Sequence, residues 1–306
     1  MSSYFWSSAS STDPTLGANW TKSDGTTGTA PGSGDDAYVQ SIPGIVLANI
    51  GAADMSAVAL NSLTISSTYI GTIGTADTSS PLFGYWKIGA VTWTIGAPSS
   101  DGVSYGGSGR VKIDFGAGAF SGVVLTTGPS VDSGVEPVRL LANNAASSMV
   151  ILGGRVGVAT NLPGETASVG EIDVSGGNAI CDLGAGVTWT TANVSSGGAI
   201  SSHSGSGGTL SVGPGGLAIT QGAGAIATIE AGGNLSLNHR PASGAAVTTL
   251  NLYPTGVADF SQNPAAVAVA TLNHHRDGVL IANAANPGHL TVTTRNLVNC
   301  GTLTAS

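Results

Sequence analysis

Charged residues are scarce in this sequence. Only 8% of its 306 residues are Asp, Glu, Lys or Arg, and 17 acidic side chains stand against 9 basic ones, for a formal net charge of −8. Binding to nucleic acid needs clustered Lys and Arg to neutralise phosphates, and an anionic membrane surface has the same requirement. No apolar run reaches the roughly 18 residues of a spanning helix. We therefore expect neither nucleic acid nor a membrane as a partner.

Helix-forming patterns are also missing. No window combines a 3.6-residue apolar period with the Glu, Lys, Gln and Arg that stabilise an exposed helix, and only residues 50–63 come close to a helical turn. The opening "MSSYFWSSASSTDP" has no positive stretch followed by an apolar one, so the chain as written shows no secretory signal. The chain is therefore expected to consist essentially of β-strands.

Glycine, in contrast, is abundant, with 47 residues. The phrase "VGPGGLAIT", which begins at Val212, places two adjacent glycines before a short apolar strand, and related phrases begin 18 to 22 residues apart. They start at Val174, Val194, Val212, Glu230, Leu252 and His274. A period near twenty with two short strands in each unit is typical of a solenoid, and glycine tolerates the positive φ that a corner between strands requires.

The sequence therefore predicts an all-β protein, a single-stranded parallel β-helix (β-solenoid) with coils of about 18–22 residues. With 41% apolar residues the chain can bury a core, so its glycine content does not indicate disorder. We expect residues 1–45 to form an N-terminal cap or attachment segment and residues 46–306 the solenoid, with the clearest coils in 171–306. Cys181 and Cys300 would lie about six coils apart, too far for a disulfide, and are expected to be buried thiols.

The first 45 residues carry a resemblance. Trp6, then Asn19-Trp20, Pro31 and Gly34-Asp35-Asp36 before a strand resemble the opening segment of β-solenoid surface proteins of bacteria and bacteriophages. The resemblance implies stacked coils of the right-handed β-helix type and, as the best match in function, a phage virion decoration or fibre protein. It marks an architecture and no activity.

Two sets of residues in this segment are candidate binding residues. Aromatic rings in a polar segment are expected to order against something, and we predict that Tyr4, Phe5, Trp6 and Trp20 contact a partner. The alternative is that Trp6 and Trp20 cover the open first coil. Asp35 and Asp36 are weak candidates for calcium, but a turn whose carboxylates accept backbone N–H bonds explains them without a metal.

Catalytic residues are hard to find. Cleavage of a polysaccharide needs two carboxyl groups about 5–9.5 Å apart, whereas Asp182 and Asp259 share a register four coils apart. The weak candidates are Asp114 and Asp132, which are 18 residues apart in the sequence, although ion pairs on a solvent-facing sheet explain them as well.

Their predicted neighbours are Arg110, Lys112 and Glu136. His203 and the pair His274-His275 are expected to lie in solvated turns without a third metal ligand. Trp93 is expected in the core, with a partner contact as the alternative, and the long loops at residues 96–109 and 160–171 are expected to project. We predict no enzyme, no metal and no cofactor.

Two functions remain. The first is a non-enzymatic structural protein on a virion surface, a capsid decoration or fibre component made in the host cytoplasm. It would bind the major capsid protein or another virion protein and its own copies, with a homotrimer favoured. The alternative is an extracellular carbohydrate-binding adhesin or polysaccharide depolymerase of the β-helix type, from which a leader was removed before Met1.

Overall fold

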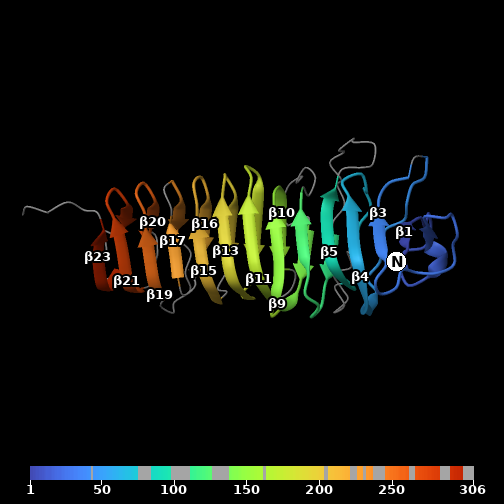
Figure 1. Ribbon diagram of the computed structural model, residues 1–306, viewed down its shortest axis with the longest axis horizontal. Coiled ribbons are helices and arrows are strands. Elements are labelled where there is room, and N and C mark those ends of the chain that lie inside the picture. Colours follow the sequence, from blue (N-terminus) through green and yellow to red (C-terminus); the bar gives the residue numbers. More distant parts are fainter. Residues whose placement is uncertain are drawn as a thin grey trace, which may run out of the picture.

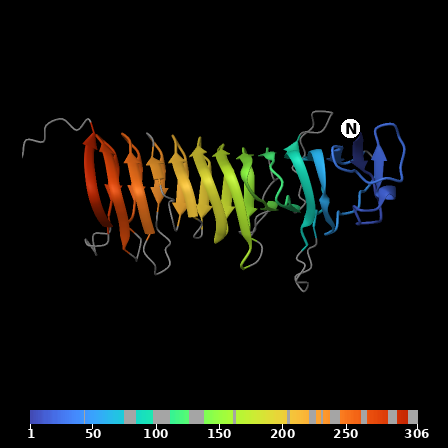
Figure 2. The same cartoon turned by 60° about the horizontal axis from the view of Figure 1, so that its bottom comes forward.

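The computed structural model describes most of the chain as one elongated stack of strands (Figures 1 and 2). The described residues are 1–42, 44–74, 84–97, 111–125, 138–160, 163–202, 206–220, 226–229, 232–236, 245–261, 266–282 and 290–298. Within them there is one 3-10 turn, Gly17–Asn19, and no α-helix. The expected all-β, parallel solenoid is confirmed. Residues 50–63 form no helical turn, because most of them belong to a strand.

One column of parallel strands runs the whole length of the molecule. Twelve steps of roughly 4.8 Å between its strands give a length of about 58 Å. The strands, in the order in which they pair, are β1 (Ser3–Trp6), β3 (Asp36–Val39), β4 (Asp54–Ser66), β5 (Trp86–Ala97), β7 (Ser121–Val124), β9 (Asn143–Ile151), β11 (Thr166–Ser175), β13 (Gly186–Ser195), β15 (Ser206–Val212), β17 (Ile226–Ile229), β19 (Ala245–Leu252), β21 (Val267–His275) and β23 (Leu290–Val298).

A second column begins where the first residues of β5 pair with β6. It contains β6 (Val111–Asp114), β8 (Val138–Leu141), β10 (Gly154–Val158), β12 (Ala179–Leu183), β14 (Ala199–Ser202), β16 (Leu217–Thr220), β18 (Asn234–Ser236), β20 (Val257–Asp259) and β22 (Val279–Ile281). From β6 onward each coil places one strand in each column, and the core lies between the columns.

The length of a coil changes along the stack. In the C-terminal half, Ile172 is aligned with Ala192, and Ala192 with Leu210, so the coils have the expected size. In the N-terminal half, Leu63 is aligned with Trp93 and Trp93 with Gly122, about thirty residues at each step. These longer coils explain why the sequence shows no repeat there.

Two tryptophans fill the interior by lying over a glycine of the next coil. Trp93 is aligned with Gly122 and Trp189 with Gly207, and a Cβ on either glycine would lie about 2 Å from the ring. Both rings are buried, which confirms the interior position expected for Trp93. Glycine serves in this fold to admit a large ring as well as to form corners such as Gly215, at φ +70°.

Candidate functional site

The aromatic residues of the N-terminal segment lie mostly inside the cap. Tyr4, Trp6 and Trp20 are 5%, 0% and 0% exposed. The indole N–H of Trp6 donates to the carbonyl oxygen of Ala48 at 3.0 Å, and that of Trp20 donates to the carbonyl oxygen of Pro14 at 2.8 Å. Both rings are therefore fixed by hydrogen bonds as well as by packing.

The same rings connect the cap to the solenoid core. Trp6 meets Trp20 edge-on at 5.3 Å between ring centroids, and Trp20 lies 6.4 Å from Trp86, the first residue of β5. Buried rings present no surface to a partner, so Tyr4, Trp6 and Trp20 cannot make the contact that was predicted for them while the cap is folded. Phe5 is half-buried and stacks on Tyr38 at 5.1 Å.

Asp35 and Asp36 join the first two coils by hydrogen bonds. The Asp35 carboxylate accepts backbone N–H bonds from Ser2 at 2.8 Å and from Gly32 at 3.1 Å, as expected for a turn. Asp36 accepts from the side chains of Asn61 and Ser62, and these bonds lower the pKa of its carboxyl group. Among the described residues no group of three potential ligands could hold a metal ion.

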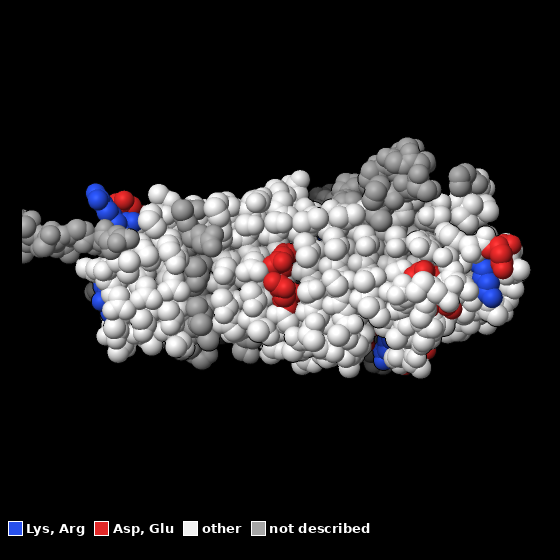
Figure 3. Space-filling view, viewed as in Figure 1, with Lys and Arg blue, Asp and Glu red and all other residues white. Residues whose placement is uncertain are grey.

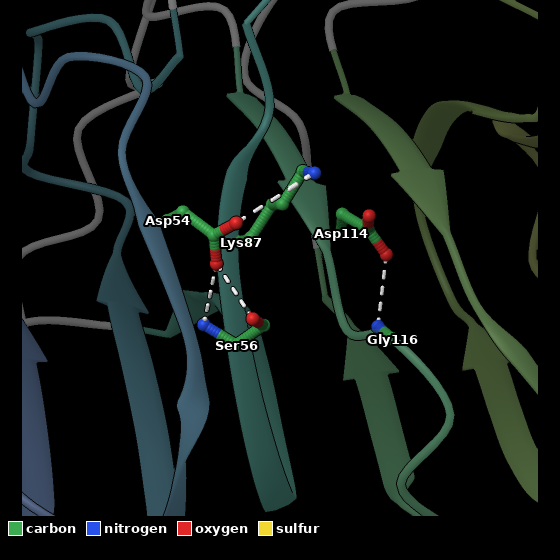
Figure 4. Close-up of polar contacts among 5 residues, drawn as sticks. All are labelled: Asp54, Ser56, Lys87, Asp114 and Gly116. Atoms are coloured by element: carbon green, nitrogen blue, oxygen red, sulfur yellow. Dashed lines mark hydrogen bonds and ion pairs between the residues drawn. The ribbon is translucent and has the colours of Figure 1, made fainter.

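Asp114 belongs to a row of alternating charge on three neighbouring strands. Asp54 is aligned with Lys87, and Lys87 with Asp114. Lys87 reaches to 3.9 Å from the Asp54 carboxylate, whereas the Asp114 carboxylate turns to the backbone N–H of Gly116 at 2.8 Å (Figure 4). Hydrogen bonds from Ser56 lower the pKa of Asp54. Two carboxylates two coils apart with a lysine between them, of which Asp54 pairs with Lys87, are typical of charges on a solvent-facing sheet.

The other members of the predicted cluster are only partly visible. Asp132, Arg110 and Glu136 lie outside the described residues, so the pairing of Asp114 with Asp132 stays a prediction. Lys112, two residues before Asp114 on β6, is 8% exposed and is aligned with Arg139. The described part of this region therefore concentrates charge, without a visible pair of carboxylates suited to catalysis.

A contact that sequence reasoning missed connects two long-coil segments. The hydroxyl of Tyr85 donates to the Glu165 carboxylate, with both oxygens at 3.1 Å, across 80 positions of sequence. Burial, followed by the charge of Glu165, raises the pKa of Tyr85 well above its ordinary value. Glu165 lies in a loop that was predicted to project, and this end of the loop instead contacts the shaft. The loop at 98–110 lies outside the described residues.

The remaining polar candidates are separate from one another. Four strand steps separate Asp182 from Asp259, as expected, and Asp182 is buried with its carboxylate paired to Arg155. His274 belongs to β21 and, instead of lying in a solvated turn, is partly buried. Cys181 is buried, as predicted. Two further predictions, for His203 and Cys300, fall outside the described residues.

The outer face of the first column carries mostly neutral polar side chains, together with Glu171 and Asp173. One row contains mostly hydroxyls, which we call the hydroxyl row, and the row two residues further along each strand contains amides and hydroxyls, which we call the amide row. The hydroxyl row is Ser62, Thr92, Ser121, Ser148, Glu171, Thr191, Thr209, Thr249, Thr271 and Thr294. The amide row includes Asp173, Asn193, Ser211, Asn251, Asn273 and Asn296.

Amide side chains hydrogen-bond from coil to coil along the amide row. Asn193 donates to Asp173 at 2.6 Å, Asn273 donates to Asn251 at 2.7 Å, and Asn296 donates to Asn273 at 2.8 Å. Figure 3 shows this face of the molecule. It carries very little charge, with one acidic spot near its middle, over β11. Glu171 and Asp173 are the two acidic residues of that strand.

Comparison with known proteins gives no functional assignment. No family model matches the chain, and neither a curated protein nor a solved structure is significantly similar to it. Among the described residues, no helix is long and apolar enough to cross a membrane. Functional inference therefore depends on the fold and on the residues described above.

Proposed function

We propose that this protein is a non-enzymatic structural component of a virion surface, a shaft that binds the particle and its own copies. The observation that carries this proposal is the uninterrupted first column, in which every strand from β1 to β23 pairs with the next. A stack joined by backbone hydrogen bonds along its whole length suits a spacer or a decoration protein. The row Asp54, Lys87 and Asp114 is consistent with this role, because Lys87 pairs with Asp54 and the Asp114 carboxylate accepts from the nearby N–H of Gly116.

The proposed attachment region remains within the first 50 residues, but its surface differs from the one expected. Because the tryptophans are buried, we place the contact on the turn in which the N–H of Ile45 donates to the carbonyl oxygen of Ile42. Ile45 is 46% exposed and Val46 is 82% exposed. Exposed aliphatic side chains on a tight turn are suited to insertion into an apolar depression on a partner protein.

Purified particles test this proposal directly. An antibody raised against the chain should label intact virions from the source lysate in immunoelectron microscopy, and the chain should remain with the particles through a density gradient. A Val46→Glu variant should lose the particles, whereas Leu152→Glu, which places the same charge at an exposed leucine of the shaft, should remain bound. Particles that lack the chain would refute the proposal.

The neutral outer face favours a second candidate, a carbohydrate-binding protein. Thr249, Asn251, Thr271 and Asn273 present hydroxyl and amide groups on neighbouring strands, and the exposed Tyr253 stacks on His275 beside them at 4.4 Å. Such groups suit the hydroxyls of an uncharged sugar polymer. Glu171 and Asp173, two residues apart on β11, are the carboxylates that a depolymerase could use at this face.

Neutral polysaccharides distinguish the two candidates. If the face binds sugar, isothermal titration with neutral glycan oligomers should show heat that a Thr249→Lys, Thr271→Lys double variant abolishes. If the chain is a depolymerase, Glu171→Gln and Asp173→Asn should each remove the release of reducing ends. The virion proposal predicts no cleavage by the parent protein.

A further inference from the structure

Three rows of side chains lie next to one another on the outer face of β19, β21 and β23. They are the hydroxyl row, the amide row and, two residues further along the chain, a stacked pair of rings. Their members here are Thr249, Thr271 and Thr294, then Asn251, Asn273 and Asn296, then Tyr253 and His275. All of these side chains are at least partly exposed.

The amide row keeps hydrogen-bonding capacity for a ligand. An asparagine side chain has two N–H donors and an oxygen with two lone pairs. Asn273 donates one N–H to Asn251 at 2.7 Å and accepts one bond from Asn296 at 2.8 Å. These bonds fix the orientation of the amide and use half of its capacity. Asn273 therefore offers one donor and one acceptor to a ligand, in a direction that its neighbours determine.

The rows on either side of the amides differ in character. Thr271, two residues before Asn273, adds a hydroxyl that can donate and accept. On the other side, Tyr253 and His275 stack at 4.4 Å between ring centroids, and Tyr253 is 39% exposed. Charge appears only at the margins of this part of the face (Figure 3). Hydroxyl and amide groups beside aromatic carbon suit the hydroxyls and the C–H surface of an uncharged sugar ring.

The repeat of the shaft determines the shape of a ligand that fits. Neighbouring strands lie about 4.8 Å apart, so the groups of the amide row recur at this interval along the stack. An extended β-1,4-linked hexose chain advances by nearly the same distance for each sugar. An α-1,4-linked chain of the same sugar coils, and its successive sugars do not stay over one row.

We propose that the outer face of β19, β21 and β23 binds an extended, uncharged β-1,4-linked glycan along the shaft, with one sugar over each coil. This inference rests on the carbohydrate-binding candidate above and adds the linkage and direction of the polymer. Thr271 and Asn273 bind hydroxyls of the sugar over their coil, and Tyr253 contacts its C–H surface. A polyanion does not fit, because the same two rows contain Glu171 and Asp173 further along the shaft.

The dependence of affinity on oligomer length tests the proposal. In isothermal titration of the full chain, β-1,4-linked oligomers of glucose, mannose or N-acetylglucosamine should gain about 2- to 10-fold in affinity for each sugar added from the dimer to the tetramer, because each sugar reaches another coil. The matched control is the α-1,4-linked glucose series, which should bind more weakly and without this gain. If both linkages bind alike, or if affinity does not rise with length, the proposal is wrong and the carbohydrate-binding candidate stands. If neither series gives heat, both are wrong.

Matched variants place the ligand on this face. Thr271→Val removes one hydroxyl and keeps the shape of a side chain that suits a strand, and it should weaken binding of the tetramer by about 2- to 10-fold. Tyr253→Ala removes the exposed ring and should also weaken it. The control is Ser201→Ala, which removes a hydroxyl from β14 in the second column and should bind as the parent does. Unchanged binding by Thr271→Val and Tyr253→Ala, or an equal loss in Ser201→Ala, would refute the proposed position even if the length series succeeds.

Discussion

The two ends of the solenoid protect the core by different means. At the N-terminal end, a segment of the chain folds over the first coil and buries Trp6 and Trp20 against Trp86. At the last described coil, the interior rows end in His274 and Arg295. An apolar lid adds buried area and stabilises the fold, whereas a charged edge adds little stability but opposes pairing with another chain. The two regions therefore differ in what they bury: the lid buries apolar rings, whereas the last described coil carries a charge in its interior row.

The largest expected effect is at the N-terminal lid. Trp20→Ala removes a fully buried ring whose indole N–H donates to Pro14, and we expect the free energy of unfolding to fall by about 3–5 kcal/mol. Chemical denaturation measures this loss. Phe5→Ala removes a half-buried ring of β1 that stacks on Tyr38, and should cost only about 1 kcal/mol. Equal losses would show that the lid does not close the core.

The tryptophan–glycine pairs in the middle of the shaft should show the next largest effect. Gly207→Ala places a methyl group about 1.9 Å from the Trp189 ring, and we expect a loss of about 1–3 kcal/mol from overpacking. Replacing Trp189 with Leu in the same chain should recover much of this loss, because the ring is what the methyl group meets. Additive losses in the double variant would show that the added methyl group does not meet the Trp189 ring.

The amide row should contribute less, and less at its end than inside the stack. Asn273 donates to Asn251 and accepts from Asn296, so Asn273→Ala removes two hydrogen bonds, each worth about 1 kcal/mol at most on a partly exposed face. Asn296→Ala removes one. Asn273→Ala should lower the melting temperature more than Asn296→Ala does. The reverse order would contradict the hydrogen bonding along the amide row.

The smallest effect is the pH dependence contributed by Asp36 at the N-terminal end. Hydrogen bonds from Ser62 and Asn61 lower its pKa in the folded state, so its stabilising effect is present above the unfolded value of about 3.9 and is lost as the pH falls below it. The difference in melting temperature between the parent and Asp36→Asn should therefore shrink between pH 7 and about pH 3. A constant difference would show that the charge is not involved.

The sequence predicts the C-terminal coils well because their corners recur at nearly constant spacing. The N-terminal coils give no visible repeat in the sequence, because Leu63 and its partner Trp93 are thirty residues apart and the stretch between them shares no pattern with the next coil. The pairing of Trp93 with Gly122 is equally hard to predict, because neither residue indicates the other without a register. Once that register is known, Arg295 stands out against Leu272 as the one charged residue in its interior row.

The lid illustrates a different limit. An aromatic residue in a polar segment gives the same sequence pattern whether it packs on a partner or on the first coil of its own chain. The hydrogen bond from Trp6 to Ala48, 42 positions later, distinguishes the two, and it depends on tertiary structure. The role of the Asp35 carboxylate was easier to predict, because aspartate in a turn usually accepts hydrogen bonds from nearby backbone N–H groups.

Hydrogen exchange of the intact protein, followed by mass spectrometry, tests the central claim most directly. If a folded lid closes the N-terminal end of a continuous shaft, the amides of β1 and β3 should exchange as slowly as those of β11 and β13, because global unfolding would be needed to open them. The amides of β23 should exchange first. Rapid exchange in β1, at the rate of β23 or faster, would contradict the account and return the N-terminal segment to the status of a loose attachment arm.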